Sequence, residues 1–220
     1  GLGRVTVSLD ALDAEVFAAM SDTAVPVGRV LDGIDAAVTA GLHPVKINSV
    51  VRRGVNEDQV VPLARYARER GVTIRFIEYM DVGHTNGWSP ADVVPAGEIL
   101  ARVAAAHPLE PSTRDDPSAT AVTYRYRDGA GEVGMVASVT QPFCGSCTRA
   151  RLSPAGELFT CLFASRGTDV RGLLRGGADD DALLDRVGGT WTRRADRYSE
   201  TRADRRGGRS DRVEMSYIGG

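Results

Sequence analysis

Cysteine, histidine and lysine are scarce in this chain of 220 residues, and long apolar runs are absent from it. Three cysteines are too few, and odd in number, for the disulfide framework of a small secreted protein. No apolar run approaches the roughly 18 residues that a membrane-spanning helix needs. The formal net charge of −2 lacks the positive excess that is typical of nucleic-acid-binding proteins. We therefore expect a cytoplasmic protein that binds neither membranes nor nucleic acids.

Lysine is the scarcest of the three, because Lys46 is the one lysine among 27 basic residues. A GC-rich genome accounts for the general bias toward arginine. It does not make the two cations equivalent, since ammonium is a compact point charge and guanidinium a planar fork. Lys46 is therefore a candidate binding residue.

Strand-like and helix-like segments alternate over the first eighty residues, and 42% of the whole chain is hydrophobic, enough for a core. Apolar runs rich in β-branched residues predict buried strands at 5–9, 45–51 and 72–80. Helical spacing predicts helices at 27–40 and 57–70, with Asn56 capping the second. This alternation predicts an α/β fold with right-handed βαβ units and a parallel sheet. Three such strands cannot close an eight-stranded barrel, but they could form half of one.

After residue 95 the sequence pattern predicts one helix and then strands that are not separated by helices. A helix at 96–106 is followed by two alternating strands, 121–127 and 133–139, that form a hairpin around a glycine turn. We expect this hairpin to belong to a second, smaller layer with antiparallel character. Residues 192–212, with eight arginines and four acids, predict a loosely ordered, solvated surface, whereas the apolar residues of 215–220 predict a docked tail.

All three cysteines lie in one stretch: Cys144 and Cys147 form a CxxC pair, and Cys161 follows after thirteen intervening residues. In a reducing compartment such a set is more often a metal or redox site than a disulfide. Three thiolates suit a four-iron cluster that keeps one iron open to an outside ligand. Structural zinc needs a fourth ligand, which would have to come from one of three distant histidines. A site without metal is the third alternative.

Two arginines follow the CxxC pair closely, and strand alternation puts Arg149 and Arg151 on one face. Two guanidinium groups on one face can bind phosphate oxygens in a forked geometry. The alternative is that they pair with carboxylates of this chain. Beside a metal with an open position, the pair favours a phosphorylated ligand that coordinates iron.

Several stretches resemble one family, and they occur in that family's order from about residue 4 to the end. The chain resembles the GTP 3′,8-cyclases (MoaA) of molybdenum cofactor biosynthesis, which are radical S-adenosylmethionine enzymes. The resemblance rests on residues 7–11 (VSLDA), 45–48 (VKIN), 74–83 (IRFIEYMDVG), 86–88 (NGW), 143–152 (FCGSCTRARL), 161–164 (CLFA) and 217–220 (YIGG).

This resemblance implies a fold and a set of site residues. Residues 1–82 would be the C-terminal half of a partial (βα)6 barrel, and 83–220 a smaller α+β domain with an auxiliary iron–sulfur cluster. The implied roles are cluster ligands for Cys144, Cys147 and Cys161; GTP contacts for Lys46, Arg149, Ala150 and Arg151; S-adenosylmethionine contacts for Ser8 and Met80; and a catalytic tail for Gly219 and Gly220. The open iron of the cluster would take the guanine base.

The resemblance also implies a reaction and partners. A 5′-deoxyadenosyl radical removes hydrogen from C3′ of GTP, and the C3′ radical attacks C8 to give 3′,8-cyclo-7,8-dihydro-GTP. Such an enzyme needs S-adenosylmethionine and an external electron donor, and its product passes to the pterin synthase MoaC. The resemblance is also compatible with a homodimer.

One departure from the family is large. The family's radical-generating cluster is held by an N-terminal CxxxCxxC motif, whereas every cysteine here lies at or after position 144. We therefore expect a C-terminal fragment that is inactive alone. The alternative functions are a non-catalytic module with zinc in the three-cysteine site and a different radical enzyme. The arginine pair and the Gly-Gly end count against the latter.

Overall fold

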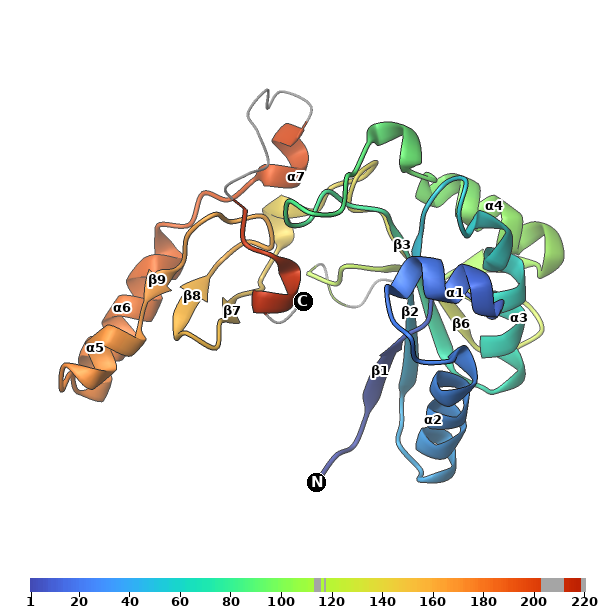
Figure 1. The fold of residues 1–220 in the computed structure, drawn as a ribbon, viewed down its shortest axis with the longest axis horizontal. Coiled ribbons are helices and arrows are strands. Elements are labelled where there is room, and N and C mark those ends of the chain that lie inside the picture. The colour runs from blue at the N-terminus through green and yellow to red at the C-terminus, as the bar shows by residue number, and fades with distance from the viewer. Residues whose placement is uncertain (113–115, 117, 203–211, 219–220) are drawn as a thin grey trace. The chain divides into compact units, whose positions relative to one another are not determined.

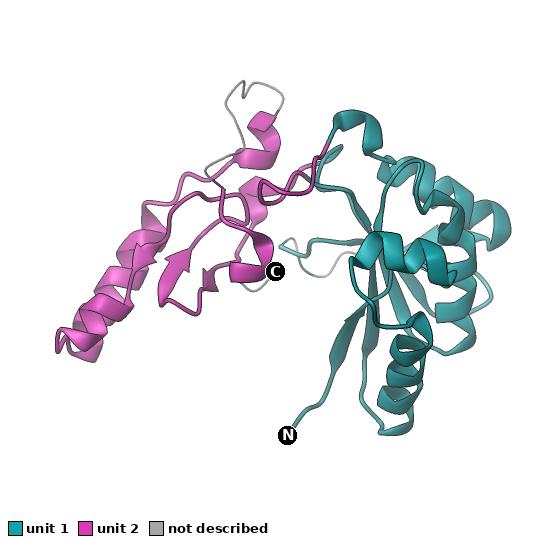
Figure 2. Ribbon diagram, viewed as in Figure 1, with its two compact units in different colours: residues 1–80, 89–141 teal, residues 81–88, 142–220 magenta. Residues whose placement is uncertain are grey.

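A computed structural model describes the chain except residues 113–115, 117, 203–211 and 219–220. The described residues form two compact units (Figure 2): the first consists of 1–80 and 89–141, and the second of 81–88 and 142–220. Within the described residues, no helix is long and apolar enough to cross a membrane. Gly219, Gly220 and much of the predicted Arg-rich segment lie outside the described residues.

A six-stranded sheet forms the centre of the first unit (Figure 1). Its strands, in spatial order, are β1 (Val5–Ser8), β2 (Val45–Val51), β3 (Thr73–Glu78), β6 (Glu132–Val136), β5 (Val122–Tyr126) and β4 (Leu109–Pro111). The first four run parallel, and β5 and β4 continue the sheet in antiparallel pairing. The predicted α/β class with a parallel sheet is thus confirmed.

Four α-helices accompany this sheet: α1 (Ala14–Ser21), α2 (Val27–Thr39), α3 (Val60–Glu69) and α4 (Ala96–Ala106). The last three agree with the predicted helices. Helix α1 was not predicted; Asp13 caps it by accepting hydrogen bonds from the amides of Glu15 and Val16 at 3.0 Å. The predicted cap of α3 by Asn56 is wrong. The Asn56 amide group instead bonds the backbone of other loop residues, such as the Arg52 N–H at 2.7 Å.

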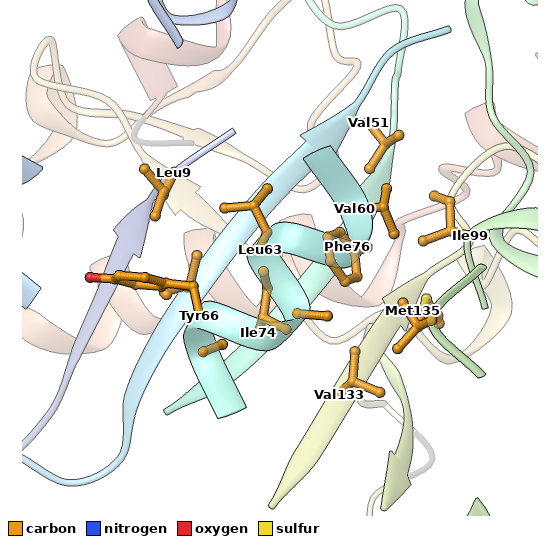
Figure 3. Packing of buried hydrophobic residues seen from close by; sticks show 14 of the residues in the cluster. Leu9, Val51, Val60, Leu63, Tyr66, Ile74, Phe76, Ile99, Val133 and Met135 are labelled. Carbon is orange, nitrogen blue, oxygen red and sulfur yellow. The ribbon is translucent and has the colours of Figure 1, made fainter. Parts of the chain in front are cut away.

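The apolar core of the first unit lies between the helices and one face of the sheet. Alternation along β2 and β3 sends every second side chain into this core, so Ile74 and Phe76 are buried against Leu63 of α3 and Ile99 of α4 (Figure 3). Each such side chain contributes about 1.5–3 kcal/mol through burial. The intervening residues of β2 and β3 point to the opposite face, away from this core.

The hairpin of β5 and β6 differs from its predicted placement. It extends the first sheet, because β6 pairs in parallel with β3, with Ile74 opposite Val133. The sequence of β6 explains this position: from Val133 to Val136 the strand is buried on both faces, as a central strand must be. Residues 89–141 therefore belong to the first unit, whereas the sequence predicted a single domain for all of 83–220.

A buried carboxylate fixes the hairpin to the end of β3. Glu78 is fully buried and accepts hydrogen bonds from the amides of Ala96 at 2.8 Å, Val139 at 2.7 Å and Thr140 at 2.8 Å. Ala96 begins helix α4, whose positive end also favours a carboxylate. One side chain thus joins a strand end, a helix start and the segment after β6.

The second unit contains a small antiparallel sheet of β7 (Arg151–Leu152), β8 (Glu157–Phe159) and β9 (Thr168–Asp169). Its helices are α5 (Arg171–Arg175), α6 (Asp180–Thr192) and α7 (Tyr198–Thr201), and single 3-10 turns lie at Cys144–Ser146 and Met215–Ile218. Ile218 is buried, so the described part of the tail is docked, as predicted.

Candidate functional site

The three cysteines lie near one end of the small sheet. Cys144 begins a 3-10 turn, and the amide of Cys147 closes it by donating to the Cys144 carbonyl at 3.3 Å. Strand β7 leaves this turn at Arg151, which lies opposite Phe159 in β8. Cys161 follows β8 by two residues. Antiparallel pairing therefore returns the chain from β8 toward the CxxC turn, which the sequence spacing alone does not show.

Two of the sulfur atoms accept hydrogen bonds. The Arg149 guanidinium donates to Cys147 Sγ at 3.0 Å, and the Phe163 amide donates to Cys161 Sγ at 3.4 Å. Although burial alone would raise it, the pKa of the Cys147 thiol is lowered, because Arg149 donates to its sulfur. Burial raises the pKa of the Cys161 thiol. Cys147 is therefore the more readily ionised of these two thiols.

Arg194 is a site residue that sequence reasoning missed. Its guanidinium donates to the carbonyl of Cys147 and to Asp196 at 3.3 Å, and Asp196 in turn accepts from Thr160 at 2.6 Å. Thr160 directly precedes Cys161, so this chain of contacts connects the CxxC turn with the third cysteine. The Arg194 side chain is 12% exposed, which contradicts the predicted solvated role of this position. No motif or periodicity marks it in the sequence.

The donor chemistry of this site fits an iron–sulfur cluster. All three thiols are half-buried, and Cys144 is close enough to act electrostatically on Cys161. Amide and guanidinium N–H groups aimed at sulfur are the usual surroundings of cluster thiolates. In the part of the chain that the structure describes, no three histidine, cysteine or acidic side chains are grouped closely enough for a single metal ion. A four-iron cluster is wider than one ion, so its ligands stand further apart.

The two predicted phosphate-binding arginines lie beside the thiols. Arg151 is half-buried; burial lowers its pKa, and the charge of Arg149 lowers it further. Ala150 is exposed between them. Among the described side chains, no ion pair joins Arg149 or Arg151 to a carboxylate. The alternative that these arginines balance carboxylates of the chain thus finds no support among the described residues.

Ser8, Lys46 and Met80 belong to the first unit. Lys46 points to the face of β2 that lies away from the apolar core, and the register puts Ser8 opposite Asn48 on that same face. Burial lowers the pKa of Lys46, and the charges of Arg75 and Arg4 lower it further. Met80 follows β3 by two residues. The sheet therefore brings Ser8 and Lys46 to one face.

Arg75 is a second cation on this face that the sequence analysis did not select. It lies opposite Asn48 in β2 and Gly134 in β6, is half-buried, and burial lowers its pKa. A Cβ at Gly134 would meet Arg75 Cγ at 3.0 Å and Ala121 Cβ at 3.3 Å, so glycine gives the arginine stem room. The signal in the sequence was a lone arginine between apolar residues of a strand.

Comparison with known proteins agrees with the resemblance in the sequence. The family described as Molybdenum Cofactor Synthesis C matches residues 72–200. The GTP 3′,8-cyclase of Acidothermus cellulolyticus is 51% identical over 244 aligned residues, which cover 100% of this chain and 67% of that protein. The chain belongs to the GTP 3′,8-cyclase family. Family members named GTP 3′,8-cyclase from Synechococcus sp. CC9902 and Xanthomonas axonopodis pv. citri are 45% and 48% identical across the whole chain, which spans 67% and 65% of their lengths.

Proposed function

We propose that this chain carries the auxiliary cluster and the GTP-binding groups of a GTP 3′,8-cyclase, a radical-SAM lyase of molybdenum cofactor biosynthesis. The intact enzyme would convert GTP to 3′,8-cyclo-7,8-dihydro-GTP. One observation carries this proposal: Arg149 and Arg151 are half-buried beside three thiols and have no carboxylate partner among the described side chains. Buried cations without an acid are stabilised by a bound anion, and triphosphate is such an anion.

Cys144, Cys147 and Cys161 are the residues that would hold the cluster. When bound, a four-iron cluster with three protein ligands supplies an open iron position for the guanine base. The chain's own contribution is to stabilise thiolates: Arg149 donates to Cys147 Sγ and the Phe163 amide to Cys161 Sγ. Arg194 holds the backbone of Cys147, which keeps the CxxC turn beside the third cysteine.

The cations bind and orient GTP. Arg149 and Arg151 neutralise phosphate oxygens, with Ala150 exposed between them. Lys46 contributes a compact ammonium from the sheet face, and a phosphate near it would raise its lowered pKa again. Ser8 and Met80 would contact S-adenosylmethionine at the ends of β1 and β3. The tail residues Gly219 and Gly220 would act at GTP.

The chain alone should bind GTP weakly and turn over none of it, because the family's CxxxCxxC motif does not occur in the sequence. For the whole enzyme we also propose two protein partners, an external electron donor and the synthase MoaC, which would take the product. The proposed assembly is a homodimer. Isothermal titration calorimetry with GTP, after anaerobic reconstitution, measures the expected weak binding. Detection of 5′-deoxyadenosine from this chain with S-adenosylmethionine and reductant would overturn the expected lack of turnover.

The decisive experiment concerns Cys161. After anaerobic reconstitution, iron and acid-labile sulfide should be present in wild type, and Cys161→Ser should lose most of the iron. Ser146→Ala, in the same turn as Cys144 and Cys147, is the matched control and should keep it. If wild type instead binds zinc in a tetrahedral site, the cluster proposal is wrong and the metal-binding module is correct.

A further inference from the structure

A buried carboxylate in the second unit holds together segments that are far apart in the chain. Asp81 is 2% exposed and accepts hydrogen bonds from Tyr198 Oη at 2.5 Å, Arg202 Nε at 2.8 Å and Arg212 Nη1 at 3.0 Å. We name these four residues the Asp81 cluster. Its partners come from 117, 121 and 131 residues further along the sequence.

The Asp81 cluster is strongly held because both of its guanidinium groups are buried. The side chains of Arg202 and Arg212 are 9% and 11% exposed. Arg212 also donates to the backbone carbonyl of Asp81, and Arg202 lies 5.3 Å from the ring centre of Phe163. Removing the carboxylate would leave two buried cations without their anion, which is strongly unfavourable.

A second contact holds the same terminal segment two residues later. The Glu214 carboxylate accepts a hydrogen bond from the His84 amide at 3.0 Å. It lies directly against Gly83, whose φ is +63°, and a Cβ there would come within 2.1 Å of Glu214 Oε2. The positive φ favours glycine at position 83, and any side chain there would displace the Glu214 carboxylate. Residues 81–84 thus hold Arg212 and Glu214 at adjacent points.

The rest of the described tail is fixed to the same unit. The amide of Val213 donates to the Ala164 carbonyl at 3.4 Å, Tyr217 Oη donates to Glu157 at 3.3 Å, and Ile218 is 1% exposed. Ile218 is bonded to Gly219, so the position of residues 212–218 sets where the last two residues begin.

We propose that Asp81 is a positioning residue that anchors residues 212–218 through Arg212 and thereby delivers the Gly219-Gly220 end to its place of action. The anchoring stands on the contacts above, and its catalytic meaning rests on the proposed function. Asp81 directly follows Met80, so the same short stretch would serve the cofactor and the tail.

The anchoring is tested on the chain itself by timed carboxypeptidase digestion. Release of Ile218 and Tyr217 should be about tenfold faster in Asp81→Asn than in wild type, because a buried charged partner is lost. Arg212→Gln should act in the same direction while Asp81 keeps Arg202 and Tyr198. Arg186→Gln, an exposed arginine of α6, is the control and should digest like wild type. Amide hydrogen exchange in β7 and β8 should stay unchanged, which separates a released tail from an unfolded unit. Equal digestion rates in Asp81→Asn and wild type would overturn the anchoring.

The positioning role is tested in the full-length protein by a double-mutant cycle. Asp81→Asn should lower kcat for GTP about tenfold with little change in KM, and should have almost no further effect once Gly219 and Gly220 are deleted. Full additivity of the two changes would contradict the positioning role. If wild type itself converts no GTP, the proposed function fails, while the digestion result still decides the anchoring.

Discussion

The two units are stabilised by different interactions. In the first, one apolar cluster joins all the described α-helices and the central strands, and Leu9, Ile34 and Phe76 are among its buried members. In the second, large buried apolar side chains are few among the described residues. Its buried polar contacts join Asp81 to Tyr198, Arg202 and Arg212, and Arg194 to Asp196 and the Cys147 carbonyl. Apolar burial involves no charge that pH can titrate or ionic strength can screen, whereas charged hydrogen bonds do. The first unit should therefore hold its fold without a ligand, and the second should gain stability from one.

The largest effect is expected in the apolar core. Phe76→Ala removes a fully buried ring from the centre of the first unit and should cost about 3–5 kcal/mol of unfolding free energy. Urea denaturation followed by circular dichroism measures the loss. Val38→Ala, at a 40% exposed position on α2, is the control and should change little. A loss below about 1 kcal/mol for Phe76→Ala would mean that the apolar cluster does not determine the stability of this unit.

Low pH should weaken the contacts of the second unit that depend on the charge of Asp81. Burial alone would raise the pKa of Asp81, but Tyr198, Arg202 and Arg212 together lower it below the usual value of 3.8. A carboxyl with a lowered folded-state pKa contributes stability above its unfolded pKa and loses it as the pH falls through the folded value. Protease resistance of residues 212–218 should therefore fall in wild type as the pH drops below 3.8 and through the folded-state pKa of Asp81. In Asp81→Asn the same pH dependence should be much weaker; an identical pH profile in both proteins would refute this explanation.

The cations proposed to bind GTP are of two types, a lysine in the first unit and two arginines in the second. In a full-length protein, Lys46→Arg should cut kcat/KM for GTP about tenfold, equivalent to about 1.4 kcal/mol, since a planar fork must fit beside Arg75 and Arg4. Arg149→Lys and Arg151→Lys should lose a similar amount, because lysine cannot make the forked contact with phosphate that is proposed for each arginine. Cluster content should stay constant in all three. If Lys46→Arg behaves as wild type, the assignment of Lys46 to GTP must be dropped.

The smallest effect is expected at a surface ion pair of the first unit. Arg70 and Asp35 lie 2.7 Å apart, but their side chains are 32% and 53% exposed. Asp35→Ala should cost less than about 1 kcal/mol, and 0.5 M salt should reduce even that. The measurement is urea denaturation at two salt concentrations. If Asp35→Ala cost as much unfolding free energy as Phe76→Ala, exposed ion pairs would stabilise this unit as strongly as its buried core.

Local periodicity explains which parts of the fold could be predicted. Strand β2 and helix α4 match their predicted bounds because each has an uninterrupted apolar pattern against one core. Helix α6 gave no such signal: Leu184 and Trp191 are exposed on it, so its apolar residues do not mark a buried face. Strand β4, with three residues and a proline, is too short to recognise.

Part of the candidate site could be predicted from the sequence, and part of it could not. The cysteines and the Arg149–Arg151 pair could be predicted because all of them lie in the single stretch 144–161. Arg194 is 47 residues from Cys147, and Arg212 is 131 residues from Asp81. Contacts between single polar residues at such separations leave no periodic trace in a sequence. They become visible once tertiary structure brings the segments together.

Glu78 has a consequence for the order in which the chain can fold during synthesis. Its carboxylate accepts hydrogen bonds from the amides of Ala96, 18 residues later, and of Val139 and Thr140, 61 and 62 residues later. The first unit therefore cannot complete the hydrogen bonds of this buried side chain until residue 140 has been synthesised. By then residues 81–88 have already emerged, although their partners near the end of the chain have not. The hydrogen bonds of Glu78 can therefore form before those of Asp81, whose partners Tyr198, Arg202 and Arg212 are synthesised later.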